Sequence, residues 1–158
     1  MKINNAQLSP AWLLIPALTG ISLIVFFLPF VGGQKQPALV NSVKQNMTFF
    51  KETVDKFISI HHRPPVNIQE LQADAKKNNY NKTFFNPVSK HSGDMNNLQI
   101  ITQYHQSQIV QLNLEFQSPL FAGKVGFFTR GSQYVIYGHE YAGKLIQENG
   151  HLFQLGNF

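Results

Sequence analysis

The chain has 158 residues, a net charge of +5 and no cysteine; 13% of its residues are charged and 13% are aromatic. This length suits one ordinary domain with an additional segment. Without cysteine, the chain has no disulfide, no thiolate metal site and no cysteine nucleophile. The modest positive charge permits acidic partners without requiring them.

The first strong pattern is an apolar run that follows a short N-terminal tail at 1–10. Residues 11–31 contain no charged side chain, and at about 1.5 Å per residue they would form roughly 32 Å of helix. This matches the roughly 30 Å hydrocarbon core of a bilayer. We therefore predict a transmembrane helix at 11–32 and a linker at 33–38. The alternatives are a buried core helix and a signal peptide cleaved after Gly33.

The segment after the linker has helical periodicity. Apolar residues recur at spacings of three and four from Leu39 to Ile58, and most charged residues fall on the other face. This pattern predicts a long amphipathic helix with one buried stripe. The double proline in "HHRPPVNIQEL" ends this helix. Asn67 and Glu70 then resemble a capping pair for a short second helix that runs to about Lys77.

The C-terminal part changes to a period of two. After an irregular loop, "LQIITQY", "IVQLNLEF", "GKVGFFT", "QYVIYGHE", "GKLIQ" and "HLFQL" are strand candidates. Short turns that contain glycine separate the last four, and Asn149-Gly150 is a strong hairpin signal. The predicted fold is therefore α+β: a transmembrane helix, then a long amphipathic helix packed on an antiparallel β-meander, with residues 39–158 as one domain.

This order of parts resembles the type IV pilins and the pseudopilins of type II secretion systems. "VKQNMTFFKETVDKF" is similar to the soluble half of the pilin stem helix, and "HHRPPVNIQELQ" and "FFNPVSK" resemble turns that follow it. The block "GKVGFFTRGSQYVIYGHEYAGKLI" resembles the C-terminal hairpins, with Y-x-I-x-G at Tyr134 to Gly138. The resemblance implies a membrane-anchored stem helix, a pilin-like domain and partners within a pilus or secretion assembly.

The same resemblance draws attention to "GISLIV" inside the apolar run. Prepilins are cleaved after a glycine, and an acidic residue follows five positions later; here Gly20 precedes Ile21, and Val25 stands where the acid is expected. Cleavage after Gly20 would leave eleven apolar residues, roughly 16 Å of helix, too short for a bilayer. We therefore interpret this as a degenerate site and expect the mature protein to retain Trp12.

Enzyme chemistry has little support in the sequence. The adjacent His61 and His62 point in different directions on a helix and cannot readily share one metal ion. The other four histidines and the eight acids are dispersed, and no phosphate loop, GxSxG or HExxH motif occurs. We expect no catalytic residue, no cofactor and no metal site, with a histidine-bearing metal site as the less favoured alternative.

The loop at 76–90 supports a more specific hypothesis. Basic residues alternate with aromatic residues in "KKNNYNKTFFNPVSK", and the candidate contacts for DNA or another acidic ligand are Lys76, Lys77, Tyr80, Lys82 and Lys90. Lysines that follow a phosphate backbone beside rings that stack on bases are typical of single-strand binding. In the alternative interpretation, Phe84 and Phe85 fill the core while the lysines are solvated.

The sequence therefore supports three functions in descending order. The first is a non-catalytic, membrane-anchored pilin-like protein that contacts other proteins in or beside a type IV pilus or a type II secretion-like assembly. The second is a tethered envelope module that binds DNA or another acidic ligand through the loop at 76–90. The third is an envelope enzyme that uses one of the histidines. We expect the lipid bilayer as a partner and a single-pass location in the cytoplasmic membrane, with the C-terminal domain in the periplasm or outside the cell.

Overall fold

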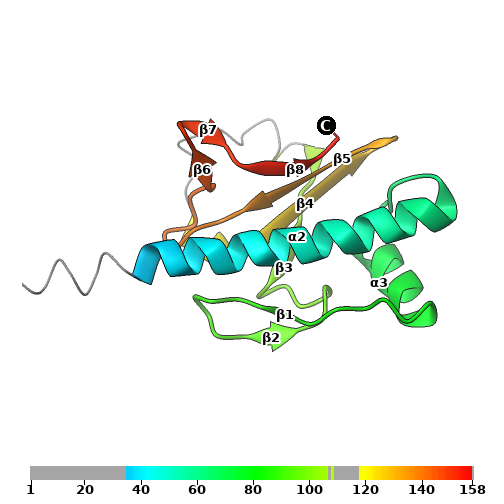
Figure 1. Cartoon of the computed structure of the whole chain (residues 1–158), viewed down its shortest axis with the longest axis horizontal. Coiled ribbons are helices and arrows are strands. Elements are labelled where there is room, and N and C mark those ends of the chain that lie inside the picture. Colours follow the sequence, from blue (N-terminus) through cyan, green and yellow to red (C-terminus); the bar gives the residue numbers. More distant parts are fainter. Residues whose placement is uncertain (1–34, 107, 109–117, 158) are drawn as a thin grey trace, which may run out of the picture. The chain divides into compact units, whose positions relative to one another are not determined.

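The computed structural model describes residues 35–106, 108 and 118–157. All of these except Lys35 belong to a compact unit that runs from Gln36 to Phe158. This unit is α+β (Figure 1). No helix among the described residues is long and apolar enough to cross a membrane. The described part of the structure therefore does not contain the transmembrane helix that the predicted fold includes. The predicted tail at 1–10, span at 11–32, most of the linker and the degenerate cleavage site lie outside the described residues.

The long amphipathic helix is confirmed as α2, Lys35–His61. It begins four residues before the predicted start, because Pro37 lies in its first turn, where a backbone N–H has no intrahelical partner in any case. Its stripe is buried at every central position: Val43, Met47, Phe50, Val54 and Phe57 are at most 1% exposed.

Helix α2 ends where the double proline predicts. His62 adopts φ +55° and donates its N–H to the Ile58 carbonyl at 2.8 Å, a left-handed C-terminal cap. The second helix is confirmed as α3, Ile68–Lys77, and the Asn67 side chain accepts the Glu70 N–H at 2.8 Å. The capping pair seen in the sequence therefore fixes the start of this helix.

The central sheet differs from the predicted antiparallel meander. Its strand order is β3 (Ile101–Gln103), β4 (Val125–Arg130), β5 (Gln133–Gly138) and β8 (Gln154–Gly156). Strands β4, β5 and β8 pair antiparallel, but β3 pairs parallel with β4. A parallel pair needs a crossover rather than a tight turn, and the residues between β3 and β4 include the strand candidate "IVQLNLEF", which falls at 109–116, outside the described residues.

Two small hairpins complete the fold. Strands β6 (Gln147–Glu148) and β7 (His151–Leu152) are joined by Asn149 and Gly150, both at positive φ, as the Asn-Gly signal predicts. Strands β1 (Phe84–Phe85) and β2 (Ser92–Gly93) pair within the loop expected to be irregular. A one-turn 3-10 helix, η1 (Pro119–Phe121), precedes β4.

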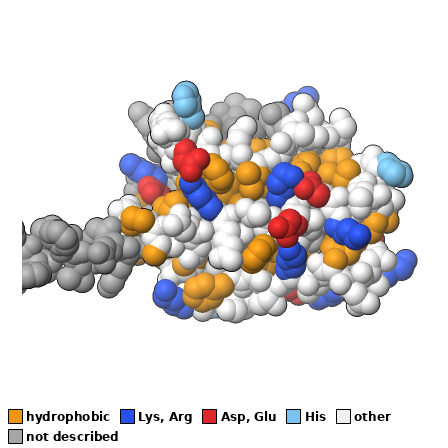
Figure 2. Space-filling view, in the orientation of Figure 1, with side chains coloured by type: hydrophobic (Ala, Val, Ile, Leu, Met, Phe, Trp, Pro, Cys, Tyr) orange, Lys and Arg blue, Asp and Glu red, His pale blue; other side chains and the backbone are white. Residues whose placement is uncertain are grey.

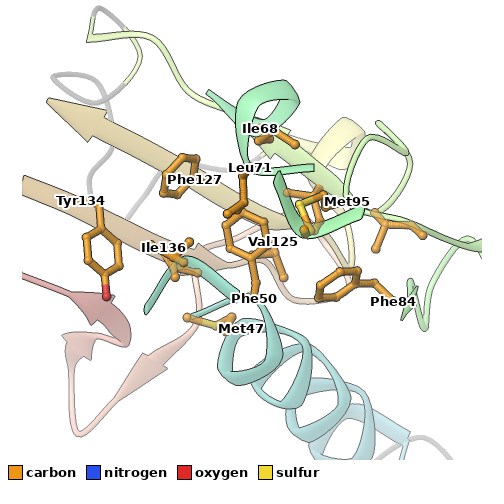
Figure 3. Close-up of a cluster of buried hydrophobic side chains, with 14 of the residues drawn as sticks. Met47, Phe50, Ile68, Leu71, Phe84, Met95, Val125, Phe127, Tyr134 and Ile136 are labelled. Atoms are coloured by element: carbon orange, nitrogen blue, oxygen red, sulfur yellow. The ribbon is translucent and has the colours of Figure 1, made fainter. Parts of the chain in front are cut away.

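The core lies between α2 and one face of the sheet (Figure 3). Phe50 is its centre: its ring meets Phe127 edge-on at 5.3 Å between centroids and Phe84 at 6.1 Å. Helix α3 contributes Ile68 and Leu71 to the same cluster. The predicted packing of the stem helix on the sheet is confirmed.

Strand β5 runs antiparallel to α2, and two contacts fix this alignment. At the start of β5 the Tyr134 hydroxyl donates to the Asp55 carboxylate at 2.7 Å. At its end, Gly138 lies so close to α2 that a Cβ there would meet Met47 Sδ at 2.6 Å and Val43 Cγ1 at 2.9 Å. The chain that follows Gly138 therefore reaches the end of the domain where α2 begins.

Candidate functional site

The basic and aromatic loop predicted to bind an acidic ligand extends from the end of α3 to β2. Two of its lysines have acidic partners: Lys76 Nζ lies 3.1 Å from Asp94, and Lys82 is paired with Glu52 of α2. Lys82 also lies over the Phe49 ring, 4.8 Å from its centroid. Figure 2 shows other basic side chains next to acidic ones on the face along which α2 runs. These pairs reduce the positive potential available to a polyanion.

The aromatic residues of this loop differ in their exposure to solvent. Phe84 is 1% exposed and belongs to the core, while Phe85, its neighbour in β1, is 42% exposed. Lys90 Nζ lies 5.7 Å from the centre of the Phe85 ring. Tyr80 donates its hydroxyl to Asp74, and burial with this hydrogen bond raises the pKa of Tyr80. Among the aromatic residues of this loop, Phe85 is the most exposed, and its ring lies beside a lysine.

Lys77 is exposed on the last turn of α3. Lys76, Lys77, Tyr80, Lys82 and Lys90 thus lie on one connected stretch, but not as a row of free cations between stacking rings. Binding of DNA through this loop stays the less favoured hypothesis.

Asn86 fixes the conformation of the loop. Its buried side-chain amide donates to the Gln99 carbonyl at 2.6 Å and to the Ala122 carbonyl at 3.0 Å. Its side-chain oxygen accepts the N–H groups of Val88 at 2.8 Å and Ser89 at 3.0 Å. All four hydrogen-bonding positions of the amide are filled, so Asn86 joins this loop to the entries of β3 and β4.

Two histidines have defined roles in the packing. His61 contacts Asp74 of α3 at 2.9 Å, and its ring lies 4.3 Å from that of Phe57. Burial raises the pKa of Asp74, but hydrogen bonds from Tyr80, His61 and Asn78 outweigh it and leave the pKa lowered. His61 therefore links α2 to α3.

His139 is fully buried behind the sheet. Its Nδ1 lies 2.9 Å from the Gly143 carbonyl, and its Nε2 contacts the Tyr104 hydroxyl. Since a carbonyl only accepts, Nδ1 carries the proton and Nε2 accepts from Tyr104. Burial lowers the pKa of His139 to about 4 and raises that of Tyr104. This pair is a neutral, satisfied hydrogen bond without access for a substrate.

The described residues hold no group of three histidine, aspartate or glutamate side chains that could bind a metal ion. The absence of a metal, a cofactor and catalysis stays a prediction. The sequence signalled Asn86 through its Asn-Pro dipeptide, whereas nothing local distinguished His139 from the exposed histidines. No family model, no curated protein and no solved structure matches this chain.

Proposed function

We propose that this chain is a pilin-like protein with a non-catalytic role in protein–protein contact, in or beside a type IV pilus or a type II secretion-like assembly. We place it at the cytoplasmic membrane, with residues 39–158 on the outer side. The location rests on the uncharged apolar sequence at 11–31.

The observation that carries the proposal is the packing of α2 on β5. The resemblance to pilins rests in part on a stem-like helix and on Y-x-I-x-G at Tyr134 to Gly138. In the fold these two parts meet: Gly138 leaves room for Val43 and Met47 of α2, and Tyr134 bonds to Asp55. The residues of this motif therefore allow α2 to pack closely along β5.

The chemistry of the domain also supports contact rather than catalysis. Its most buried polar side chains, Asn86 and His139, are engaged in structural hydrogen bonds. Lys76 and Lys82 of the predicted acidic-ligand loop are paired with Asp94 and with Glu52 of α2. We infer that partners contact the exposed loops of the domain.

The test is cross-linking of the full chain in its own cells, followed by mass spectrometry of the captured proteins. We expect pilin-like subunits or components of a pilus or secretion machine, enriched over an unrelated membrane protein carrying the same tag. Reproducible capture of proteins from outside such assemblies, with none from within them, would refute the proposal.

A further inference from the structure

Two strongly exposed apolar side chains lie on neighbouring loops of the domain. Leu120 in η1 is 77% exposed, and Tyr141, in the turn after β5, is 67% exposed. Their loops touch: the Gly123 N–H donates to the Glu140 carbonyl at 3.3 Å, and a Cβ at Gly143 would meet the Ser118 carbonyl at 1.8 Å. Single exposed apolar residues are common on soluble surfaces, but these two lie on loops that are in contact with each other. We call the surface of these two loops the Leu120–Tyr141 patch.

The Leu120–Tyr141 patch lies at the end of the domain where α2 begins. Strand β5 passes Asp55 at its start and Val43 at its end, so the turn with Tyr141 continues toward the first turns of α2. Figure 1 shows the start of β4 and the end of β5 beside this part of the helix.

The chain that precedes α2 is attached at the same end. The apolar run ends at Val31, four residues before Lys35. In the sequence, the segment on which the proposed membrane location rests is therefore joined to the end of the domain where α2 begins.

The residues around the patch have the chemistry of a membrane interface. Lys144 is exposed and Lys124 is half-buried on the same two loops, against one acid, Glu140. Tyrosine and leucine that enter the headgroup region, with lysines nearby, are typical of interfacial contacts. The local excess of positive charge favours anionic lipid.

We propose that the Leu120–Tyr141 patch contacts the headgroup region of an anionic lipid surface and so sets the orientation of the domain. This inference rests on the membrane location in the proposed function. The contact would hold α2 at a fixed angle to the membrane and leave the opposite end of the domain, about 40 Å away along the helix, for partners.

The absence of cysteine gives a direct test, since a single introduced cysteine is unique in the chain. The full chain with Leu120→Cys or Tyr141→Cys would be labelled with an environment-sensitive fluorophore and reconstituted in vesicles of equal parts phosphatidylcholine and phosphatidylglycerol. The matched control is Val66→Cys, because Val66 is also apolar and 64% exposed but follows the far end of α2. Flotation measures membrane association, and a lipid with a quencher in its headgroup measures contact.

We expect labels at positions 120 and 141 to be quenched several-fold more than a label at position 66. Floating vesicles with equal, weak quenching at all three positions would overturn the lipid contact while leaving the membrane location intact. A chain that does not float would overturn both proposals. A blue shift at 120 and 141 that grows with protein concentration in detergent, without lipid, would show that a second copy covers the patch and would also overturn the lipid contact.

Discussion

Replacement of Asn86 by aspartate tests the hydrogen-bond network that joins the 86–91 loop to the sheet. Aspartate has nearly the same shape and keeps the oxygen that accepts from Val88 and Ser89. It replaces the two N–H donors with an oxygen that faces the Gln99 and Ala122 carbonyls, now 2.6 and 3.0 Å from the amide nitrogen. The change is therefore isosteric but reverses the polarity of one side of the group.

The expected cost follows from the two carbonyls left without a donor. A buried acceptor without a partner costs about 1–3 kcal/mol, so the pair costs about 2–6 kcal/mol. Small domains have a total unfolding free energy of about 5–15 kcal/mol, so this loss is a large part of the whole. Burial and the facing carbonyls would raise the pKa of the introduced carboxyl. The penalty is therefore full above that raised pKa and is relieved as the pH falls, because the protonated acid donates one hydrogen bond.

Urea unfolding of the fragment from Gln34 to Phe158 measures this effect by far-ultraviolet circular dichroism. The fragment should fold alone, since the core cluster draws on residues from Leu39 onward. We expect Asn86→Asp to be less stable than Asn86→Ala at pH 7, and the gap between them to narrow at pH 5. Other titrating groups cancel in this difference. An Asn86→Asp variant within about 0.5 kcal/mol of the wild type at pH 7 would refute the network.

Four further predictions concern the core, the helix–strand contact, the buried histidine and the basic loop. Phe50→Asp buries an unpaired charge and should leave the fragment unfolded; a native circular dichroism spectrum would contradict this. Gly138→Ala should lower the unfolding free energy by about 1–3 kcal/mol through overpacking, because the added Cβ would lie 2.6 Å from Met47 Sδ; an unchanged urea midpoint would contradict the close packing of β5 on α2. Burial lowers the pKa of His139 to about 4 from a normal 6.5. The neutral imidazole therefore contributes at most about 3 kcal/mol to the unfolding free energy, and this contribution should be lost as the pH falls from 6.5 to 4. His139→Gln should make the unfolding free energy depend less on pH in that range. Fluorescence anisotropy at low salt should show no DNA binding through residues 76–90; binding that weakens steeply with salt would contradict this.

The helices were predictable because their signals are local. The spacing of Val43, Met47, Phe50, Val54 and Phe57 in the sequence already marks one face of a helix. Likewise, a cap at Asn67 and the hairpin turn at Asn149 depend on residues a few positions apart. Such patterns fix the identity of an element before any tertiary contact forms.

The sheet topology and the surface depended on distant contacts. Whether β3 pairs parallel or antiparallel with β4 is decided by where the intervening chain crosses, and strand patterning does not record this. Phe84 and Phe85 are adjacent, so one must face the core and the other solvent, but the sequence does not say which. Lys82 and Glu52 pair across 30 positions, so the charge of the loop could not be judged from the loop alone.

The early start of α2 has a simple cause. Pro37 reads as a linker residue when glycines precede it, yet proline is tolerated in the first turn of a helix. Asn86 also bonds to the carbonyls of Gln99 and Ala122, and His139 to Tyr104. These partners lie far along the chain, and only the fold brings them together.

The central claim is a role in a pilus or secretion-like assembly, and deletion of the chain from its own cells tests it most directly. Surface fibres and exported protein would be counted with and without the chain, and again after the wild-type sequence is restored. We predict that fibres or export fall on deletion and recover on restoration. Unchanged fibres and unchanged export, under conditions where the wild-type protein is present in the membrane fraction, would contradict the account.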